Sequence, residues 1–220
     1  MAEPVKTQAV TLVMFLPAGQ IFRAFRDGRG DNDEGDIGIP VIGVRFHPRQ
    51  AFFPGGMVQL PEKFLVQTVC KGKILQESTL EGYLCKDERT NTVQIFSEKP
   101  EAMEDASYIQ TIYTPNAVAG EYTLLTVELV TGKTHQIRAH LASTGHPLLG
   151  DTKYGDSKLN HKMQSAFSLH HQLLHAGRIH FPQTSEGALA KVSDKTFTAP
   201  LPRQFAEILQ ALNLMPDSAC

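Results

Sequence analysis

Five segments of strand length follow one another between residues 64 and 129, and they constrain the fold more than any other feature of the chain. They span residues 64–69, 79–85, 92–96, 107–114 and 122–129. β-branched, aromatic and other apolar residues recur in them, and turn-forming or polar residues separate them. Strands that succeed one another without intervening helices pair in an antiparallel or mixed sheet. We therefore expect a domain built on such a sheet.

The flanking regions give a strand on each side of a polar loop and only two helices. Before residue 63 we expect a strand at 10–15, a glycine-rich loop at 26–36, an edge or irregular strand at 37–44 that contains Pro40, and a turn-rich stretch at 49–59. One helix is predicted at 134–143, with Thr134 as its N-cap. The other is predicted at 202–212, with Pro202 in its first turn. The sum is a single α+β domain over residues 1–220, with a mixed, largely antiparallel sheet and a few flanking helices.

Composition and cysteine content narrow the class of protein. The chain has 220 residues, 41% of them hydrophobic, which is enough for a globular core. It has no apolar run as long as a membrane helix, and its first residues make a poor signal peptide, so we expect a cytoplasmic protein. Its three cysteines, Cys70, Cys85 and Cys220, have neither the number nor the spacing of a disulfide framework or a cysteine zinc site.

The net charge of −2 hides an asymmetry. Residues 130–180 hold six Lys or Arg against two acidic residues, and eight of the nine histidines also lie there. This region therefore carries +4 and the remainder −6. Such a basic region permits contact with an anionic partner, although a solvated surface would explain it equally well.

The densest set of reactive side chains lies in residues 129–151. A strand that turns at Gly132 into a helix aims backbone N–H groups, and the side chains of Lys133, Thr134, His135 and Arg138, at one place, as an anion site requires. The segment does not favour a nucleotide-binding P-loop, because Val127 stands where that motif needs glycine. His135 and His140 are five residues apart and share no helix face for zinc, and we expect His140 to be a hydrogen-bonded core residue. His170, His171 and His175 are expected to be half-buried strand residues.

Several ordered motifs resemble the RluA-type pseudouridine synthases. They are T-G-K-T-H-Q-I-R-A-H-L at 131–141, G-H-P-L-L-G-D at 145–151 with K-Y-G at 153–155, L-H-A at 174–176 and F-T-A-P-L-P at 197–202. The resemblance covers about residues 63–214, whereas residues 1–62 are shortened and divergent and show no separate N-terminal RNA-binding domain. It implies the pseudouridine synthase catalytic fold.

The resemblance also implies site residues. The family's essential aspartate falls on Asp33 when counted back from Gly38-Ile39-Pro40, and Asp31 is the alternative because Arg29 precedes it by two residues. Arg138 would keep that carboxylate ionised through a charge-assisted pair. Leu65 replaces the tyrosine that packs against the target base, which leaves Phe64 as the aromatic substitute. The remaining substrate-binding residues are expected to be Lys133, Thr134, His135 and Gln136.

The implied function is isomerisation of uridine to pseudouridine in structured ribosomal or transfer RNA, without a cofactor or a metal. We expect RNA as the partner, no membrane and a monomer. An RNA-binding pseudoenzyme of the same fold is the alternative, because no intact R-L-D-x-x-T-S-G motif surrounds Asp33 or Asp31. A metal-dependent hydrolase that uses the histidines is a third reading.

Overall fold

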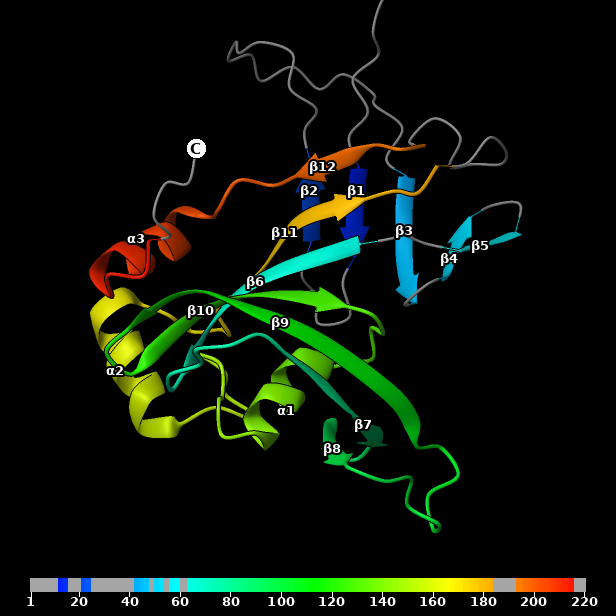
Figure 1. Cartoon of the computed structure of the whole chain (residues 1–220), viewed down its shortest axis with the longest axis horizontal. Coiled ribbons are helices and arrows are strands. Elements are labelled where there is room, and N and C mark those ends of the chain that lie inside the picture. Colours follow the sequence, from blue (N-terminus) through cyan, green and yellow to red (C-terminus); the bar gives the residue numbers. More distant parts are fainter. Residues whose placement is uncertain are drawn as a thin grey trace, which may run out of the picture.

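A seven-stranded antiparallel sheet forms the centre of the protein in a computed structural model (Figure 1). The structure describes residues 63–183 and 193–215, together with the backbone of five short strands between residues 12 and 59. Along the sheet the strands lie in the order β12-β11-β6-β10-β9-β7-β8. They are β6 (Lys63–Lys71), β7 (Ser78–Asp87), β8 (Thr92–Phe96), β9 (Ser107–Ala119), β10 (Tyr122–Leu129), β11 (Leu174–His180) and β12 (Thr196–Thr198). The expected α+β fold with a largely antiparallel sheet is confirmed.

In the part of the chain that the structure describes, three helices accompany this sheet: α1 (Gln136–Ser143), α2 (Ser157–Phe167) and α3 (Arg203–Ala211). Neighbouring residues of a strand point to opposite faces, and β10 uses both faces. Leu125 packs in a cluster with Ile137 and Leu141 of α1, whereas Leu124 packs in a cluster with Met163 of α2 and several residues of α3. The first helix therefore covers one face of the sheet, and the other two cover the opposite face.

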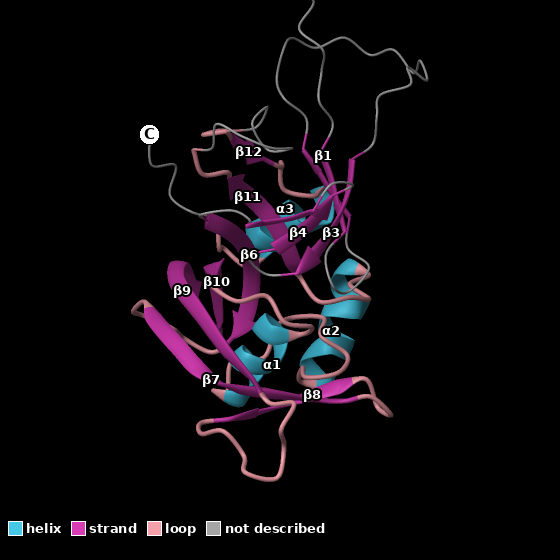
Figure 2. Ribbon diagram, turned by 90° about the vertical axis from the view of Figure 1, so that its right-hand side faces the viewer, coloured by secondary structure: helices cyan, strands magenta, loops and turns pink. Residues whose placement is uncertain are grey.

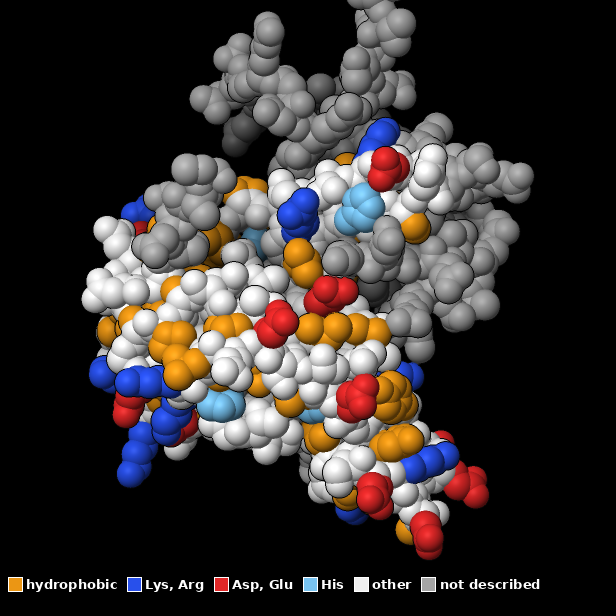
Figure 3. Space-filling view, in the orientation of Figure 1, with side chains coloured by type: hydrophobic (Ala, Val, Ile, Leu, Met, Phe, Trp, Pro, Cys, Tyr) orange, Lys and Arg blue, Asp and Glu red, His pale blue; other side chains and the backbone are white. Residues whose placement is uncertain are grey.

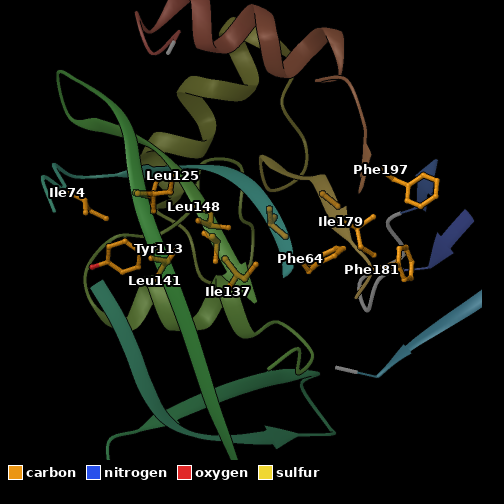
Figure 4. Close-up of a cluster of buried hydrophobic side chains, with 14 residues drawn as sticks. Phe64, Ile74, Tyr113, Leu125, Ile137, Leu141, Leu148, Ile179, Phe181 and Phe197 are labelled. Atoms are coloured by element: carbon orange, nitrogen blue, oxygen red, sulfur yellow. The ribbon is translucent and has the colours of Figure 1, made fainter. Parts of the chain in front are cut away.

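The cluster beneath α1 runs along the sheet from Ile74 and Tyr113 at one end to Phe181 and Phe197 at the other (Figure 4). A third, smaller cluster joins Ala139 of α1 to Leu84, Val93 and Ile109. Figure 2 shows α1 beside the β7–β8 hairpin, and the helix contacts β8. The hairpin thus supports the side of α1 that the main cluster leaves uncovered.

The N-terminal strands form a second sheet in the order β2-β1-β3-β4-β5. Their bounds are β1 (Leu12–Phe15), β2 (Ile21–Ala24), β3 (Ile42–His47), β4 (Gln50–Phe53) and β5 (Gly56–Gln59). The pairing of β1 with β3 is parallel and the other pairings are antiparallel. The turn-rich reading of residues 49–59 was wrong, because a strand pair occupies most of that stretch.

Three further expectations about the helices need correction. Helix α2 was not predicted, and α1 has no N-cap at Thr134 because His135 occupies that position with a left-handed backbone (φ 59°) and no side-chain cap. Pro202 is the N-cap of α3 and lies just before its first turn. Within the described residues, no helix has the length and apolar character that crossing a membrane requires.

Candidate active site

The turn between β10 and α1 is held by the side chain of Gln136. Its Oε1 accepts hydrogen bonds from Thr131 Oγ1 and from the Lys133 backbone N–H, both at 2.9 Å. Its Nε2 donates to Gln110 O and to Thr111 Oγ1, also at 2.9 Å. These bonds replace the missing N-cap, because they fix the turn immediately before the helix. They also fix the start of α1, and Arg138 follows Gln136 by two residues in that helix.

Arg138 forms a buried, two-pronged ion pair with Asp151. Its Nε donates to Asp151 Oδ2 at 2.7 Å, and its Nη2 donates to Asp151 Oδ1 at 2.6 Å. The exposed fraction is 7% for the arginine side chain and 0% for the aspartate side chain. A two-pronged pair fixes the plane of the guanidinium as well as its distance from the carboxylate. The arginine is therefore oriented before any ligand arrives.

The loop that supplies Asp151 is built around this carboxylate. Oδ1 also accepts from the backbone N–H groups of Lys153 and Tyr154, at 2.9 and 3.0 Å. Burial would raise the pKa of Asp151, but the hydrogen bonds from Arg138 and these two N–H groups outweigh burial and lower it. Gly150 precedes it with φ 74°, and a Cβ there would meet the carbonyl oxygen of His171. Only glycine fits at that position.

Strand β6 places this loop next to α1. Leu148 forms a bridge with Cys70, and the backbone N–H of Leu149 donates to Val69 O at 3.0 Å. Residues 148–149 therefore run alongside the end of β6, and the chain then turns at Gly150. Long-range backbone pairing thus brings Asp151 to an arginine thirteen residues earlier in the chain.

Tyr154 completes the constellation. Its hydroxyl accepts from the backbone N–H of Val93 at 2.8 Å and lies 3.0 Å from His135 Nδ1. Its ring centroid is 5.2 Å from the guanidinium carbon of Arg138, within cation–π range. One tyrosine thus links the β7–β8 hairpin to the start of α1.

Burial lowers the pKa of both histidines of this segment. Burial, with Arg138 and Lys153 nearby, lowers the pKa of His135 to about 4. Because Tyr154 accepts from Val93, its own proton is available to an unprotonated His135 Nδ1. Burial also lowers the pKa of His140, whose Nδ1 lies 3.0 Å from Thr111 Oγ1. The expectation that His140 is a hydrogen-bonded core residue is confirmed.

The structure brings together only part of the predicted site. His135 and Arg138 meet through Tyr154, and the half-buried Lys133 and Thr134 lie in the turn beside them. Gln136, predicted to bind substrate, is 2% exposed, and its side chain makes four hydrogen bonds within the protein.

Phe64 does not present its ring to solvent. Its side chain is 3% exposed and packs in the core cluster beneath α1, so its ring serves the core in this structure. Asp31 and Asp33 lie outside the described residues.

Asp151 and Tyr154 received no role from the sequence. Their signal was present, since both belong to the G-D-x-x-Y-G pattern at 150–155. The pattern alone does not say which side chain Asp151 would meet. A buried aspartate needs a charge partner, and that partner became evident only from the fold.

Comparison with known proteins agrees with this fold. A profile of the RNA pseudouridylate synthase family matches residues 63–143. The chain is 36% identical over 140 residues to the ribosomal large subunit pseudouridine synthase C of Haemophilus influenzae, covering 64% of this chain and 39% of the relative. It is 40% identical over 74 residues to the tRNA pseudouridine synthase C of Vibrio parahaemolyticus, covering 33% and 30%.

A solved structure shows the same fold. Human RNA pseudouridylate synthase domain containing 4 superimposes with a TM-score of 0.56 at 19% identity, over 70% of this chain and 64% of that one. The fold is thus that of the pseudouridine synthases. The sequence matches show similarity to pseudouridine synthases over part of this chain, residues 63–143 for the family profile and 140 residues for the relative from Haemophilus influenzae. The aligned segment nevertheless spans less than two fifths of the two curated relatives' own length.

Proposed function

We propose that this protein is an RNA pseudouridine synthase, which isomerises uridine within an RNA chain. The observation that carries the proposal is the buried and oriented Arg138 at the start of α1, in a segment that matches the profile of the RNA pseudouridylate synthase family. A guanidinium held in a fixed plane binds a carboxylate in a defined geometry. Asp33, or alternatively Asp31, is the carboxylate that we assign to it.

The reaction needs no cofactor because atoms and electrons balance within the nucleotide. The bond between N1 of uracil and C1′ of ribose breaks, the base turns, and C5 forms a bond to C1′. The proton of C5 is then lost and N1 acquires one. An ionised aspartate suits this sequence either as a nucleophile or as the base that removes the C5 proton. Arg138 would keep this aspartate ionised.

RNA is the proposed partner, and the basic region between residues 130 and 180 supports contact with its phosphates. On the face in Figure 3, apolar and acidic side chains are visible near the centre, whereas Lys and Arg lie mainly toward its margins. A target uridine must leave its stack to be modified, which costs least in a loop. We assign the protein to ribosomal or transfer RNA and to the cytoplasm, as a monomer without a membrane partner.

An RNA-binding pseudoenzyme is the second candidate, and one observation favours it. The two-pronged bond with Asp151 already balances the charge of Arg138. If no second carboxylate reaches this arginine, the fold would bind RNA without converting it. The two candidates therefore differ in whether Asp33 or Asp31 is needed for modification.

The decisive experiment is pseudouridine mapping in RNA from cells with and without the gene. Complementation with the wild type, Asp33→Ala or Asp31→Ala identifies the aspartate, and Asp105→Ala, an exposed acid after β8, is the matched control. We expect at least one site to disappear on deletion, to return with the wild type and the control, and to stay absent with one of the two alanines. If deletion changes no uridine, the synthase proposal is wrong.

A further inference from the structure

We propose that Asp151 and Tyr154 are positioning residues that hold Arg138 so that its remaining edge can receive a second carboxylate. The inference rests on the proposed function, because that second carboxylate is the aspartate of a pseudouridine synthase. Asp151 fixes one edge of the guanidinium and Tyr154 fixes one face. Neither residue touches the substrate in this arrangement, since each acts through the arginine.

The first argument is the number of donors that the pair leaves over. A guanidinium has five N–H groups, and Asp151 takes one from Nε and one from Nη2. Within the described residues, no hydrogen bond is made by Nη1. With respect to the described residues, the edge formed by Nη1 and the second hydrogen of Nη2 therefore has no partner, and its geometry suits another carboxylate. Two carboxylates can share the guanidinium because they occupy different edges.

The second argument is that the guanidinium cannot easily swing away. The Tyr154 ring lies against it, and the Tyr154 hydroxyl is tied to Val93 N and His135 Nδ1. Val93 belongs to β8 and His135 precedes α1, so this tyrosine is held from both sides. The β7–β8 hairpin consequently contributes to the orientation of Arg138 indirectly, through the hydrogen bond from Val93 N to Tyr154.

The third argument concerns energy. A buried ion pair is a poor device for stability, because well-packed apolar side chains of similar volume often serve as well or better. Asp151 is fully buried and makes four hydrogen bonds through its carboxylate. Such a site is better explained by a requirement for a charged group in one orientation. Polar groups held in advance spare the reaction the cost of arranging them.

Asp151→Asn tests the inference with little change of shape. The Asn oxygen, in the place of Oδ1, can still accept from the N–H groups of Lys153 and Tyr154 and from Arg138 Nη2. Its NH2 group, in the place of Oδ2, would face the N–H of Arg138 Nε, so one prong of the pair is replaced by two opposed donors. The turn should persist and the arginine should lose its orientation. We expect kcat on a target RNA to fall about 100-fold, with KM within about twofold of the wild type. Asp156→Asn is the matched control. Asp156 also accepts a hydrogen bond from a backbone N–H, as the N-cap of α2, and pairs with a positively charged side chain, Lys71, but it does not contact Arg138.

Tyr154→Leu is the second variant, since it changes no charge and remains informative if Asp151→Asn fails to fold. We expect a fall in kcat of about tenfold or more, again with little change in KM. In an Arg138→Lys background, Asp151→Asn and Tyr154→Leu should cause no additional loss, because residues that act through the arginine are not additive with it. Full additivity in that background would overturn the inference and leave the synthase function standing.

A readout that needs no activity separates the two proposals. In protein labelled with ¹⁵N-arginine, the Nε–H of Arg138 should exchange slowly with solvent in the wild type and Asp156→Asn. It should exchange rapidly in Asp151→Asn and Tyr154→Leu. If slow exchange persists in these two variants, the positioning role is wrong. If exchange behaves as expected but the wild type modifies no RNA, the failure belongs to the proposed function.

Discussion

His135 combines an unusual backbone with an uncharged imidazole at the start of α1. Its φ of 59° lies in the left-handed region, which asparagine and glycine adopt more readily than most residues. Its ring meets Tyr154 edge to face, with centroids 5.6 Å apart. Burial of the ring and the nearby charges of Arg138 and Lys153 favour the neutral form, so protonation should oppose folding.

We predict that His135 makes stability depend on pH below neutrality. Its pKa is about 4 in the folded protein and near 6.5 when unfolded. The unfolded chain therefore binds a proton first, and the free energy of unfolding falls as pH drops from about 6.5 toward 4. Between pH 7 and 5 the wild type should lose about 1 to 2 kcal/mol more than His135→Asn. Urea unfolding at several pH values measures this difference.

The control is His161→Asn, because His161 is exposed on α2 and asparagine is the same replacement. Its pH dependence should match that of the wild type. His140 and His175, whose pKa values burial also lowers, are retained in both proteins and cancel in the comparison. Equal pH dependence in His135→Asn and the wild type would contradict the assignment.

At the scale of elements, the connection from β10 to α1 depends on a side chain instead of a helix cap. Gln136 ties the turn to β9 through Gln110 and Thr111. His140, one turn further along the helix, reaches the same Thr111 hydroxyl. A short polar network therefore docks α1 on β9 and sets the position of Arg138 between these two residues.

Replacing Gln136 by leucine should be costly although the shapes are similar. The substitution removes the four hydrogen bonds of the Gln136 side chain, each worth about 0.5 to 1.5 kcal/mol, although Thr111 Oγ1 keeps its contact with His140. We expect the free energy of unfolding to fall by at least about 2 kcal/mol. Gln164→Leu, at an exposed position of α2, should change it by less than about 0.5 kcal/mol. A similar small change in both variants would show that the network does not dock the helix.

At the scale of the whole molecule, charge is distributed unevenly along a chain that is slightly acidic overall. The positive region includes the β10–α1 turn and α2, whereas the loop after β8 is acidic, with Glu98, Glu101, Glu104 and Asp105. An RNA held through phosphates should therefore contact the first region and avoid the second.

RNA binding should weaken with salt, and Lys133 should account for about one phosphate contact. Lys133→Gln is expected to reduce the slope of log K against log salt concentration by about 0.7 to 1. Lys99→Gln, exposed in the acidic loop, should leave the slope unchanged. Binding to a labelled RNA across a salt series measures both. An unchanged slope in Lys133→Gln would place the phosphate contact elsewhere.

Local sequence determined most of the central sheet. β8 and β10 have the predicted bounds, and β6, β7 and β9 contain the predicted strands. The reason is that the apolar pattern of each strand and the turn-forming residues between strands are local features of the sequence. Helix α3 was evident from its apolar spacing. Helix α2 was not, since among its residues only Met163 is fully buried and its start depends on the Asp156 cap and the pairing of that cap with Lys71.

The sequence by itself also carried the resemblance to the pseudouridine synthases and singled out Arg138 and His135. Only the tertiary structure decided what those residues meet: Asp151 beside the arginine, and Tyr154 between the arginine and the histidine. It likewise decided that Phe64 faces the covered side of the sheet. The physical reason is that a strand or helix pattern is local, whereas burial and charge pairing depend on which distant segments pack together. Here the pairing of residues 148–149 with the end of β6 brought Asp151 next to Arg138.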